Sequence, residues 1–265
     1  MIGTALGVST VGIYKFMTSR VSNRRDKVFE PPAYTSIVMC SLNEEGFIER
    51  TLQSLEDQNV LIENPADFER ILIDSNSEDE TVAIAEDYGW KVYQAPRGKL
   101  TARHVGMEKA KGKIIVSVDA DTFYAPNWLN LVLRWFRQPS VVGVVTPRLV
   151  DPTENLAVSY VSTWMSLMDV GPLLAGGMRA PGQSVALYKQ AYFDVGGFNL
   201  NINQRNVHEM VREEEIVFAM KLRRLGRLPV DWQAPCFTSL RRVMGFKKGE
   251  KYAKFIKERL NGERF

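Results

Sequence analysis

Short apolar runs alternate with segments of helical periodicity through the first half of the chain. The runs have the length of strands and read "TSIVMCS" (35–41), "RILID" (70–74), "KVYQA" (91–95), "KIIVSVD" (113–119) and "VVGVVT" (141–146). The segments between them repeat apolar residues at the spacing of a helix face, as in "EEGFIERTLQSLEDQ" (44–58). Nearly continuous apolar strands that alternate with helices predict an α/β fold, with a mostly parallel sheet covered by helices on both faces.

Polar side chains follow three of these runs at the point where each run ends. In a parallel sheet, ligands bind beyond the carboxyl ends of the strands, so we expect these residues to gather along one edge. They are Ser41 and Asn43, Asp74 and Ser75, and Asp119 and Asp121. The last pair stands out, because a run with the composition of a buried strand ends in two carboxylates.

The second half of the chain is less regular. Residues 155–178 are apolar, rich in methionine and low in charge, and are expected to form a helix and a loop against the core. "GQSVALYKQAYFDVGGFN" (182–199) predicts a strand, a short helix and a glycine turn. "REEEIVFAMKLRRLGRLPVDW" (212–232) predicts a helix followed by a strand. Because no linker separates the halves, we expect one domain over residues 31–245.

Both ends of the chain combine apolar and basic residues. Residues 2–14 are uncharged and are followed by a stretch rich in Lys and Arg. This run is shorter than the roughly 20 residues that a spanning helix needs. The segment 1–30 is therefore either a packed helix or a membrane anchor or surface helix, and both interpretations stay open. Residues 246–265 predict a basic amphipathic helix that docks on its own domain or meets anionic lipid.

The composition excludes some classes of protein. The chain has 265 residues and a net charge of +3, which is too small to indicate a nucleic-acid partner. Its two cysteines, Cys40 and Cys236, are far apart in sequence, which suggests no disulfide framework and favours a reducing compartment. We therefore expect a cytoplasmic protein, whose two ends allow contact with the cytoplasmic face of a membrane.

Asp119 and Asp121 have the spacing of a metal site that is shared with phosphate. Mg²⁺ or Mn²⁺ is commonly held by one or two carboxylates plus substrate phosphates. Asp-x-Asp alone is a weak signal, because it also occurs in turns and helix caps. A second acidic cluster, Glu213–Glu215, opens a predicted helix and exceeds what the helix dipole needs. One of these acids is a candidate general base that faces Asp119 and Asp121.

Five motifs carry a resemblance to a known family. They are "SIVMCSLNEEGFIERTLQSL", "ILIDSNSEDET", "GKLTARHVGMEKAKGKIIVSVDADT", "GGFN" and "REEEIVFAMKLRRLG", in this order. Over residues 34–245 the chain resembles the family 2 glycosyltransferases of the GT-A fold. The resemblance implies an inverting hexosyltransferase that uses a UDP- or GDP-linked sugar donor and Mn²⁺ or Mg²⁺. It also divides the domain into a nucleotide-sugar-binding half (31–150) and an acceptor half with the catalytic base (151–245).

The resemblance implies which residues hold the nucleotide. Asp74 or Ser75 would contact the base, and Lys99 would lie over the nucleotide. The base would also be held by the first loop, through Cys40, Ser41, Asn43 and Glu45.

The resemblance also implies a diphosphate and metal site. Asp119 would bind ribose or sugar hydroxyls, and Asp121, with Asp119 beside it, would bind the metal. Arg241 and Arg242 would meet the diphosphate. His208 is a candidate further metal ligand, although a lone histidine is more often a packed or surface residue.

The catalytic pair implied by the resemblance is Glu214 and Glu215. The distance along the chain to Gly226 aligns them with the Glu-Asp pair of the family, and Glu215 would be the general base. Its carboxylate would take a proton from the acceptor hydroxyl, which attacks the anomeric carbon from the face opposite the nucleotide.

Two other functions are alternatives to sugar transfer. A nucleotidyltransferase usually has a Gly-rich, basic loop after its first strand, where this chain has the acidic "SLNEEG" (41–46). A catalytically degenerate module that only binds carbohydrate is disfavoured by the presence of Asp119, Asp121 and Glu215. The acceptor stays open, because the apolar segment 155–178 and the basic ends favour a lipid-linked acceptor, while a glycan fits the motifs equally well.

Overall fold

The computed structural model describes residues 31–151, 184–200 and 207–239. The N-terminal segment 1–30, the apolar segment 155–178 and the predicted C-terminal helix 246–265 lie outside the described residues, and so do Arg241 and Arg242. The division of the chain into a domain and two terminal segments therefore stays a prediction. Among the described helices, none is both long and apolar enough to cross a bilayer.

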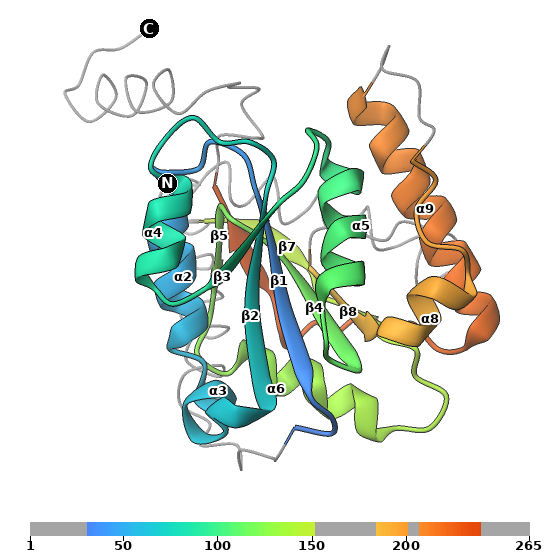
Figure 1. Ribbon diagram of the computed structural model, residues 1–265. Coiled ribbons are helices and arrows are strands. Elements are labelled where there is room, and N and C mark those ends of the chain that lie inside the picture. The colour runs from blue at the N-terminus through green and yellow to red at the C-terminus, as the bar shows by residue number, and fades with distance from the viewer. Residues whose placement is uncertain (1–30, 152–183, 201–206, 240–265) are drawn as a thin grey trace, which may run out of the picture.

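A six-stranded sheet forms the centre of the described fold, in the order β3-β2-β1-β4-β8-β6 (Figure 1). Strands β3, β2, β1 and β4 are parallel, and β8 runs antiparallel to both of its neighbours. This arrangement confirms the predicted mostly parallel α/β sheet. The strands are β1 (Thr35–Ser41), β2 (Phe68–Asp74), β3 (Lys91–Gln94), β4 (Ile114–Asp119), β6 (Gly143–Val145) and β8 (Val185–Tyr188).

Helices cover both faces of this sheet, and each face has its own apolar core. Successive residues of a strand point to opposite faces, so Ile37 and Met39 of β1 enter one core while Val38 between them enters the other. The first core is covered by α2 (Ile48–Glu56), α3 (Asn59–Glu63), α4 (Thr81–Asp87) and α6 (Trp128–Leu133). The second is covered by α5 (Lys99–Lys109), α8 (Lys189–Asp194) and α9 (Val207–Leu225), which stand on the other side of the sheet in Figure 1.

The register of the parallel strands aligns their carboxyl ends. Ser41 of β1 pairs with Asp74 of β2, and Cys40 pairs with Asp119 of β4. The polar residues that end these three strands therefore lie along one edge, as the sequence predicts.

A second, three-stranded sheet was not predicted. It has the order β5-β9-β7 and consists of β5 (Thr122–Tyr124), β9 (Cys236–Thr238) and β7 (Arg148–Val150). Strands of three residues are too short to show a period in the sequence.

The prediction of a strand at the end of the segment 212–232 is wrong. Residues there make isolated bridges to the edge of the large sheet, such as Val145 with Val230, and Pro229 has no N–H to donate to a ladder. The chain instead forms β9 a few residues later.

Gly106 sets how closely α5 packs on the sheet. A Cβ atom at this position would lie 2.4 Å from Cγ1 of Val38 and 3.3 Å from Cγ1 of Ile73. In an exposed helix, Gly→Ala stabilises by up to about 1 kcal/mol. Here we expect Gly106→Ala to lower the free energy of unfolding by about 1–3 kcal/mol, because the new methyl forces α5 away from β1.

The control for this substitution is Gly46→Ala, since a Cβ atom at Gly46 meets nothing within 4 Å. Urea unfolding of both variants measures the difference. Equal midpoints for the two variants would show that α5 is not held this closely against the strands.

Candidate functional site

Asp74 is fully buried at the end of β2 and organises the first two loops of the edge. Its Oδ1 accepts hydrogen bonds from Oγ of Ser41 (3.0 Å) and Oγ of Ser77 (2.5 Å), and its Oδ2 accepts one from the Ser77 backbone N–H (2.8 Å). The carboxylate therefore joins the end of β1 to the turn after β2. These hydrogen bonds hold the Asp74 carboxylate inside the protein. A ligand bound at this edge of the sheet would therefore contact the residues around Asp74 before Asp74 itself.

Asn43 and Glu45 of the first loop bind the backbone of the second loop. Oδ1 of Asn43 accepts from the Glu78 N–H (2.8 Å), and Oε2 of Glu45 accepts from the Glu80 N–H (3.3 Å). The Asn43 N–H in turn donates to Oγ of Ser77 (2.9 Å). Asn43 has φ 54°, a left-handed conformation that asparagine tolerates better than most residues. The two loops thus form one cross-linked rim, and a role of Asn43 and Glu45 in holding a base stays a prediction.

The other predicted residues of this rim lie beside the strand ends. The Ser75 N–H donates to the Ser41 carbonyl (3.0 Å), and the Ser75 side chain is buried. Burial raises the pKa of the half-buried Cys40 to about 12, so its thiol is neutral near pH 7. These two residues offer a ligand neutral polar groups only.

We expect Asp74→Ala to destabilise the protein strongly. The substitution leaves the buried Oγ of Ser41 and two donors of the half-buried Ser77 without their acceptor. An unsatisfied buried group costs about 1–3 kcal/mol, and the Ser77 donors can turn partly to water, so the loss should reach about 2–5 kcal/mol. Chemical denaturation measures it, with Asp87→Ala, an exposed acid on α4, as the control. A loss no larger than that of the control would mean that the rim does not depend on Asp74.

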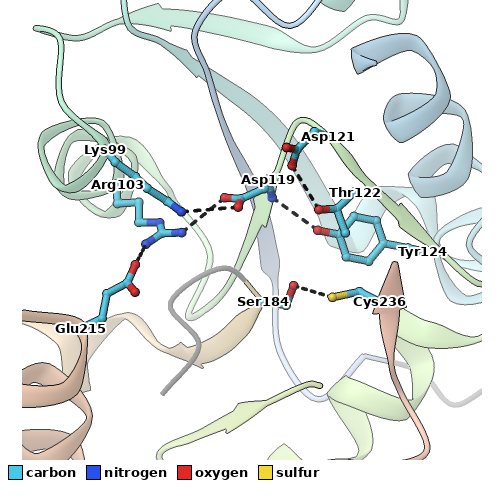
Figure 2. Close-up of polar contacts among 9 residues, drawn as sticks. All are labelled: Lys99, Arg103, Asp119, Asp121, Thr122, Tyr124, Ser184, Glu215 and Cys236. Atoms are coloured by element: carbon cyan, nitrogen blue, oxygen red, sulfur yellow. Dashed lines mark hydrogen bonds and ion pairs between the residues drawn. The ribbon is translucent and has the colours of Figure 1, made fainter. Parts of the chain in front are cut away.

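A charged cluster lies further along the same edge, between α5, β4 and α9 (Figure 2). Oδ2 of Asp119 lies 3.5 Å from Nζ of Lys99, and its Oδ1 lies 3.3 Å from Nη2 of Arg103. Nη1 of Arg103 forms an ion pair and a hydrogen bond with Oε1 of Glu215. Acids that are far apart in sequence therefore meet at one guanidinium group.

Arg103 is almost completely enclosed, with 1% of its side chain exposed. Burial alone would lower the pKa of this guanidinium, but the carboxylates of Glu215 and Asp119 outweigh that effect and raise the pKa above its ordinary value. Arg103 is therefore a fixed positive charge, and it compensates two carboxylates that would otherwise repel each other.

Asp121 lies on the other side of Asp119 from Arg103 (Figure 2). Its Oδ1 accepts a hydrogen bond from Oγ1 of Thr122 (3.4 Å), and its carbonyl accepts from the Ser239 N–H (3.1 Å), which ties the residue to the small sheet. Its carboxylate is a hard oxygen ligand of the kind that Mg²⁺ and Mn²⁺ prefer. The residue fits a cation that takes its other ligands from a bound phosphate.

The described residues contain no group of three or more His, Cys, Asp or Glu side chains able to hold a metal ion by themselves. His208 is the second residue of α9, and the position of its side chain lies outside the described residues. Both carboxylate oxygens of Asp119 face cationic groups, Lys99 and Arg103. Metal binding by Asp119 and His208 therefore stays a prediction.

Glu214 supports the loop that precedes α9. Its carboxylate is buried and accepts a hydrogen bond from the Asn199 N–H (2.7 Å). The loop begins at Gly196 and Gly197, whose positive φ angles of 81° and 62° suit glycine. Glu214 therefore holds the "GGFN" turn in place beside Glu215.

Arg103 is not among the predicted site residues, although it lies within the motif "GKLTARHVG" (98–106). Lys99 and Arg103 are four residues apart on α5, so they lie on the same face of the helix. That spacing is a signal that both cations serve the same carboxylate. Of the predicted site residues, Lys99 contacts Asp119 directly, and Glu215 is joined to them through Arg103.

Comparison with known proteins identifies the family of the chain. Residues 36–204 match Glycosyl transferase family 2, which is more than half of the chain. EpsJ of Bacillus subtilis, named a glycosyltransferase, is 34% identical over 94 residues, or 33% of this chain and 26% of EpsJ. A glycosyltransferase of Haemophilus influenzae is 25% identical over 175 residues, or 62% of this chain and 56% of that one. The chain thus spans less than two thirds of the length of these relatives.

Solved structures share the fold. The mannosyltransferase PcManGT of Pyrobaculum calidifontis matches with a TM-score of 0.61 and 19% identity, over 96% of this chain and 70% of that one. The glucosyl-3-phosphoglycerate synthase of Mycobacterium tuberculosis matches with a TM-score of 0.57 and 17% identity, over 88% of this chain and 80% of that one. With the family match, the strand order and the acidic edge, the chain belongs to glycosyl transferase family 2 and has the GT-A fold.

Proposed function

We propose that the chain moves a sugar from a UDP- or GDP-linked donor to an acceptor hydroxyl, with inversion at the anomeric carbon. The observation that carries this proposal is the cluster in which Arg103 joins Asp119, at the end of a donor-side strand, to Glu215 on α9. The similar structures were solved with nucleotide sugars or diphosphates: PcManGT with GDP-Man and Mn²⁺, and the glucosyl-3-phosphoglycerate synthase with UDP and Mn²⁺.

The donor side consists of the strand ends and Lys99. Lys99 and Arg103 hold the carboxylate of Asp119, which accepts hydrogen bonds from hydroxyl groups of the ribose or the sugar. Lys99 keeps 28% of its side chain exposed, so its ammonium group can also face the negative diphosphate. Ser41, Ser75 and Cys40, which lie at the strand ends beside the rim, hold the base through neutral groups.

Asp121 is the residue proposed to hold Mn²⁺ or Mg²⁺, together with oxygens of the diphosphate. When bound, such a cation neutralises the charge that develops on the leaving nucleotide. Asp121 lies near the end of β4 and is tied through its carbonyl to Ser239. Arg241 and Arg242, two and three residues after Ser239, are proposed to face the diphosphate.

Glu215 is proposed as the general base. Its side chain is 12% exposed, so the carboxylate can reach a substrate while Arg103 holds it from inside the protein. The carboxylate accepts the proton of the acceptor hydroxyl as that oxygen attacks the anomeric carbon. Attack from the side opposite the nucleotide inverts the configuration in one step.

The acceptor is proposed from the residues outside the described part of the chain. The apolar segment 155–178 and the basic ends suit a lipid-linked acceptor at the cytoplasmic face of a membrane, and a soluble glycan is the other candidate. Transfer to undecaprenyl- or dolichyl-linked acceptors, compared with transfer to free oligosaccharides, distinguishes the two.

The activity is tested by the release of nucleotide from a panel of UDP-glucose, UDP-N-acetylglucosamine and GDP-mannose, with Mn²⁺. Water can take the place of the acceptor hydroxyl as the attacking group, so we expect UDP or GDP to be released from one member of the panel. Release should depend on the metal and should be absent with boiled protein. No release from any donor, with any metal, would contradict the proposal.

A further inference from the structure

We propose that Arg103 is a positioning residue for the catalytic base: its guanidinium holds the carboxylate of Glu215 in place relative to Asp119. This inference rests on the proposed function, because it takes Glu215 as the base. It adds a residue to the site that neither binds the donor nor transfers the proton.

The contacts of α5 show why an arginine stands at this position. Lys99, one helical turn earlier, faces Oδ2 of Asp119, while Arg103 takes Oδ1 with one terminal nitrogen. The second terminal nitrogen of Arg103 is then directed to Glu215. The N–H donors of a guanidinium group lie in one rigid plane and point outward from different nitrogens, so the group can serve two carboxylates at once, whereas an ammonium group is a single point of charge.

Packing alone does not fix the carboxylate of Glu215. A cavity of about 20 Å³ lies at the junction of α5, β4 and α9, and it is lined by Arg103, Met107, Ser117, Glu215, Phe218 and Leu222, among others. A volume of this size holds about one water molecule. The cavity lies beside Glu215, so packing does not fill its surroundings, and the ion pair with Arg103 holds its carboxylate on the side of Asp119.

The position of a general base has a large effect on the rate. A displacement of about 1 Å in a catalytic geometry can cost about 10²-fold in turnover. Arg103→Met removes the restraint on Glu215 but leaves Lys99 on Asp119. We therefore expect kcat to fall by about 10²-fold, while the KM for the donor changes much less.

A double-mutant cycle on kcat separates positioning from a general structural role. The four proteins are the wild type, Arg103→Met, Glu215→Gln and the double variant, measured in single turnovers with the nucleotide sugar of the panel that reacts fastest. If Arg103 acts through Glu215, its removal matters only while Glu215 is present, so the double variant should be close to Glu215→Gln alone. If Arg103 only supports the fold, Arg103→Met lowers the rate by the same factor in both backgrounds, and the proposal is overturned.

Two further variants keep the test decisive. Arg224→Met removes an exposed arginine of α9 and should leave kcat unchanged. Where Arg103→Met does not fold, the cycle is made with Arg103→Lys, which keeps a buried positive charge; this variant should stay folded but recover only part of kcat. Full turnover in Arg103→Lys would overturn the proposal.

An incorrect base and an incorrect positioning role would give different results. If Glu215→Gln turns over like the wild type, the assignment of the base is wrong, and the role of Arg103 falls with it. If Glu215→Gln is impaired but Arg103→Met is not, the base assignment stands and only the positioning role is wrong.

Discussion

Glu215→Gln is expected to keep donor binding and to lose turnover. The amide retains the size of the side chain and a carbonyl oxygen that can still accept from Arg103, so the cluster should persist. It cannot take up a proton from the acceptor. General base catalysis contributes about 10²–10⁴-fold, and kcat should fall by this factor.

The measurement is the rate of sugar transfer or donor hydrolysis under saturating donor, together with donor affinity by calorimetry. Glu86→Gln, an exposed acid on α4, is the matched control and should behave like the wild type. Wild-type kcat in Glu215→Gln would remove the proposed base. Loss of donor affinity with unchanged kcat would instead place Glu215 on the donor side.

Asp121→Ala is expected to abolish metal-dependent binding of the nucleotide diphosphate. A ligand at 100 times its dissociation constant stabilises a protein by about 2.7 kcal/mol. For a domain of this size, that corresponds to an increase in Tm of about 5–10 °C. The wild type should show this increase with UDP or GDP plus Mn²⁺, and Asp121→Ala should show little or none, because the bridge between protein and diphosphate is gone.

The control for this experiment is Asp87→Ala, which lies far along the chain on an exposed part of α4. Each protein is heated with nucleotide alone, with Mn²⁺ alone and with both. A full shift in Asp121→Ala would show that the metal is held elsewhere. A shift that does not need Mn²⁺ in the wild type would show that the nucleotide binds without a bridging cation.

The large sheet could be predicted from the sequence because its strands are apolar runs with distinct polar ends. The pairing of Ser41 with Asp74, and of Cys40 with Asp119, follows once those runs lie parallel. The small sheet could not be predicted in this way. Its strands have three residues each, and β9 joins them from a point far along the chain.

The gathering of polar residues along one edge was predicted, and the contacts among them were not. A polar residue at a strand end can face a ligand or another polar residue, and the sequence does not separate the two cases. Asp74 and Asn43 both accept hydrogen bonds from the loop that follows β2. The residue types and their spacing in the sequence do not reveal these contacts. Arg103 was overlooked because an arginine on an amphipathic helix is usually exposed, whereas this one is enclosed by two acids from other elements.

A crystal structure of the chain with UDP or GDP and Mn²⁺, with the metal located by its anomalous scattering, tests the central claim most directly. The proposal places the Mn²⁺ ion at the carboxylate of Asp121, the ribose at Asp119, and the carboxylate of Glu215 across the donor pocket from the diphosphate. A metal bound to other acids, or a nucleotide that occupies a surface away from Asp119 and Glu215, would contradict it.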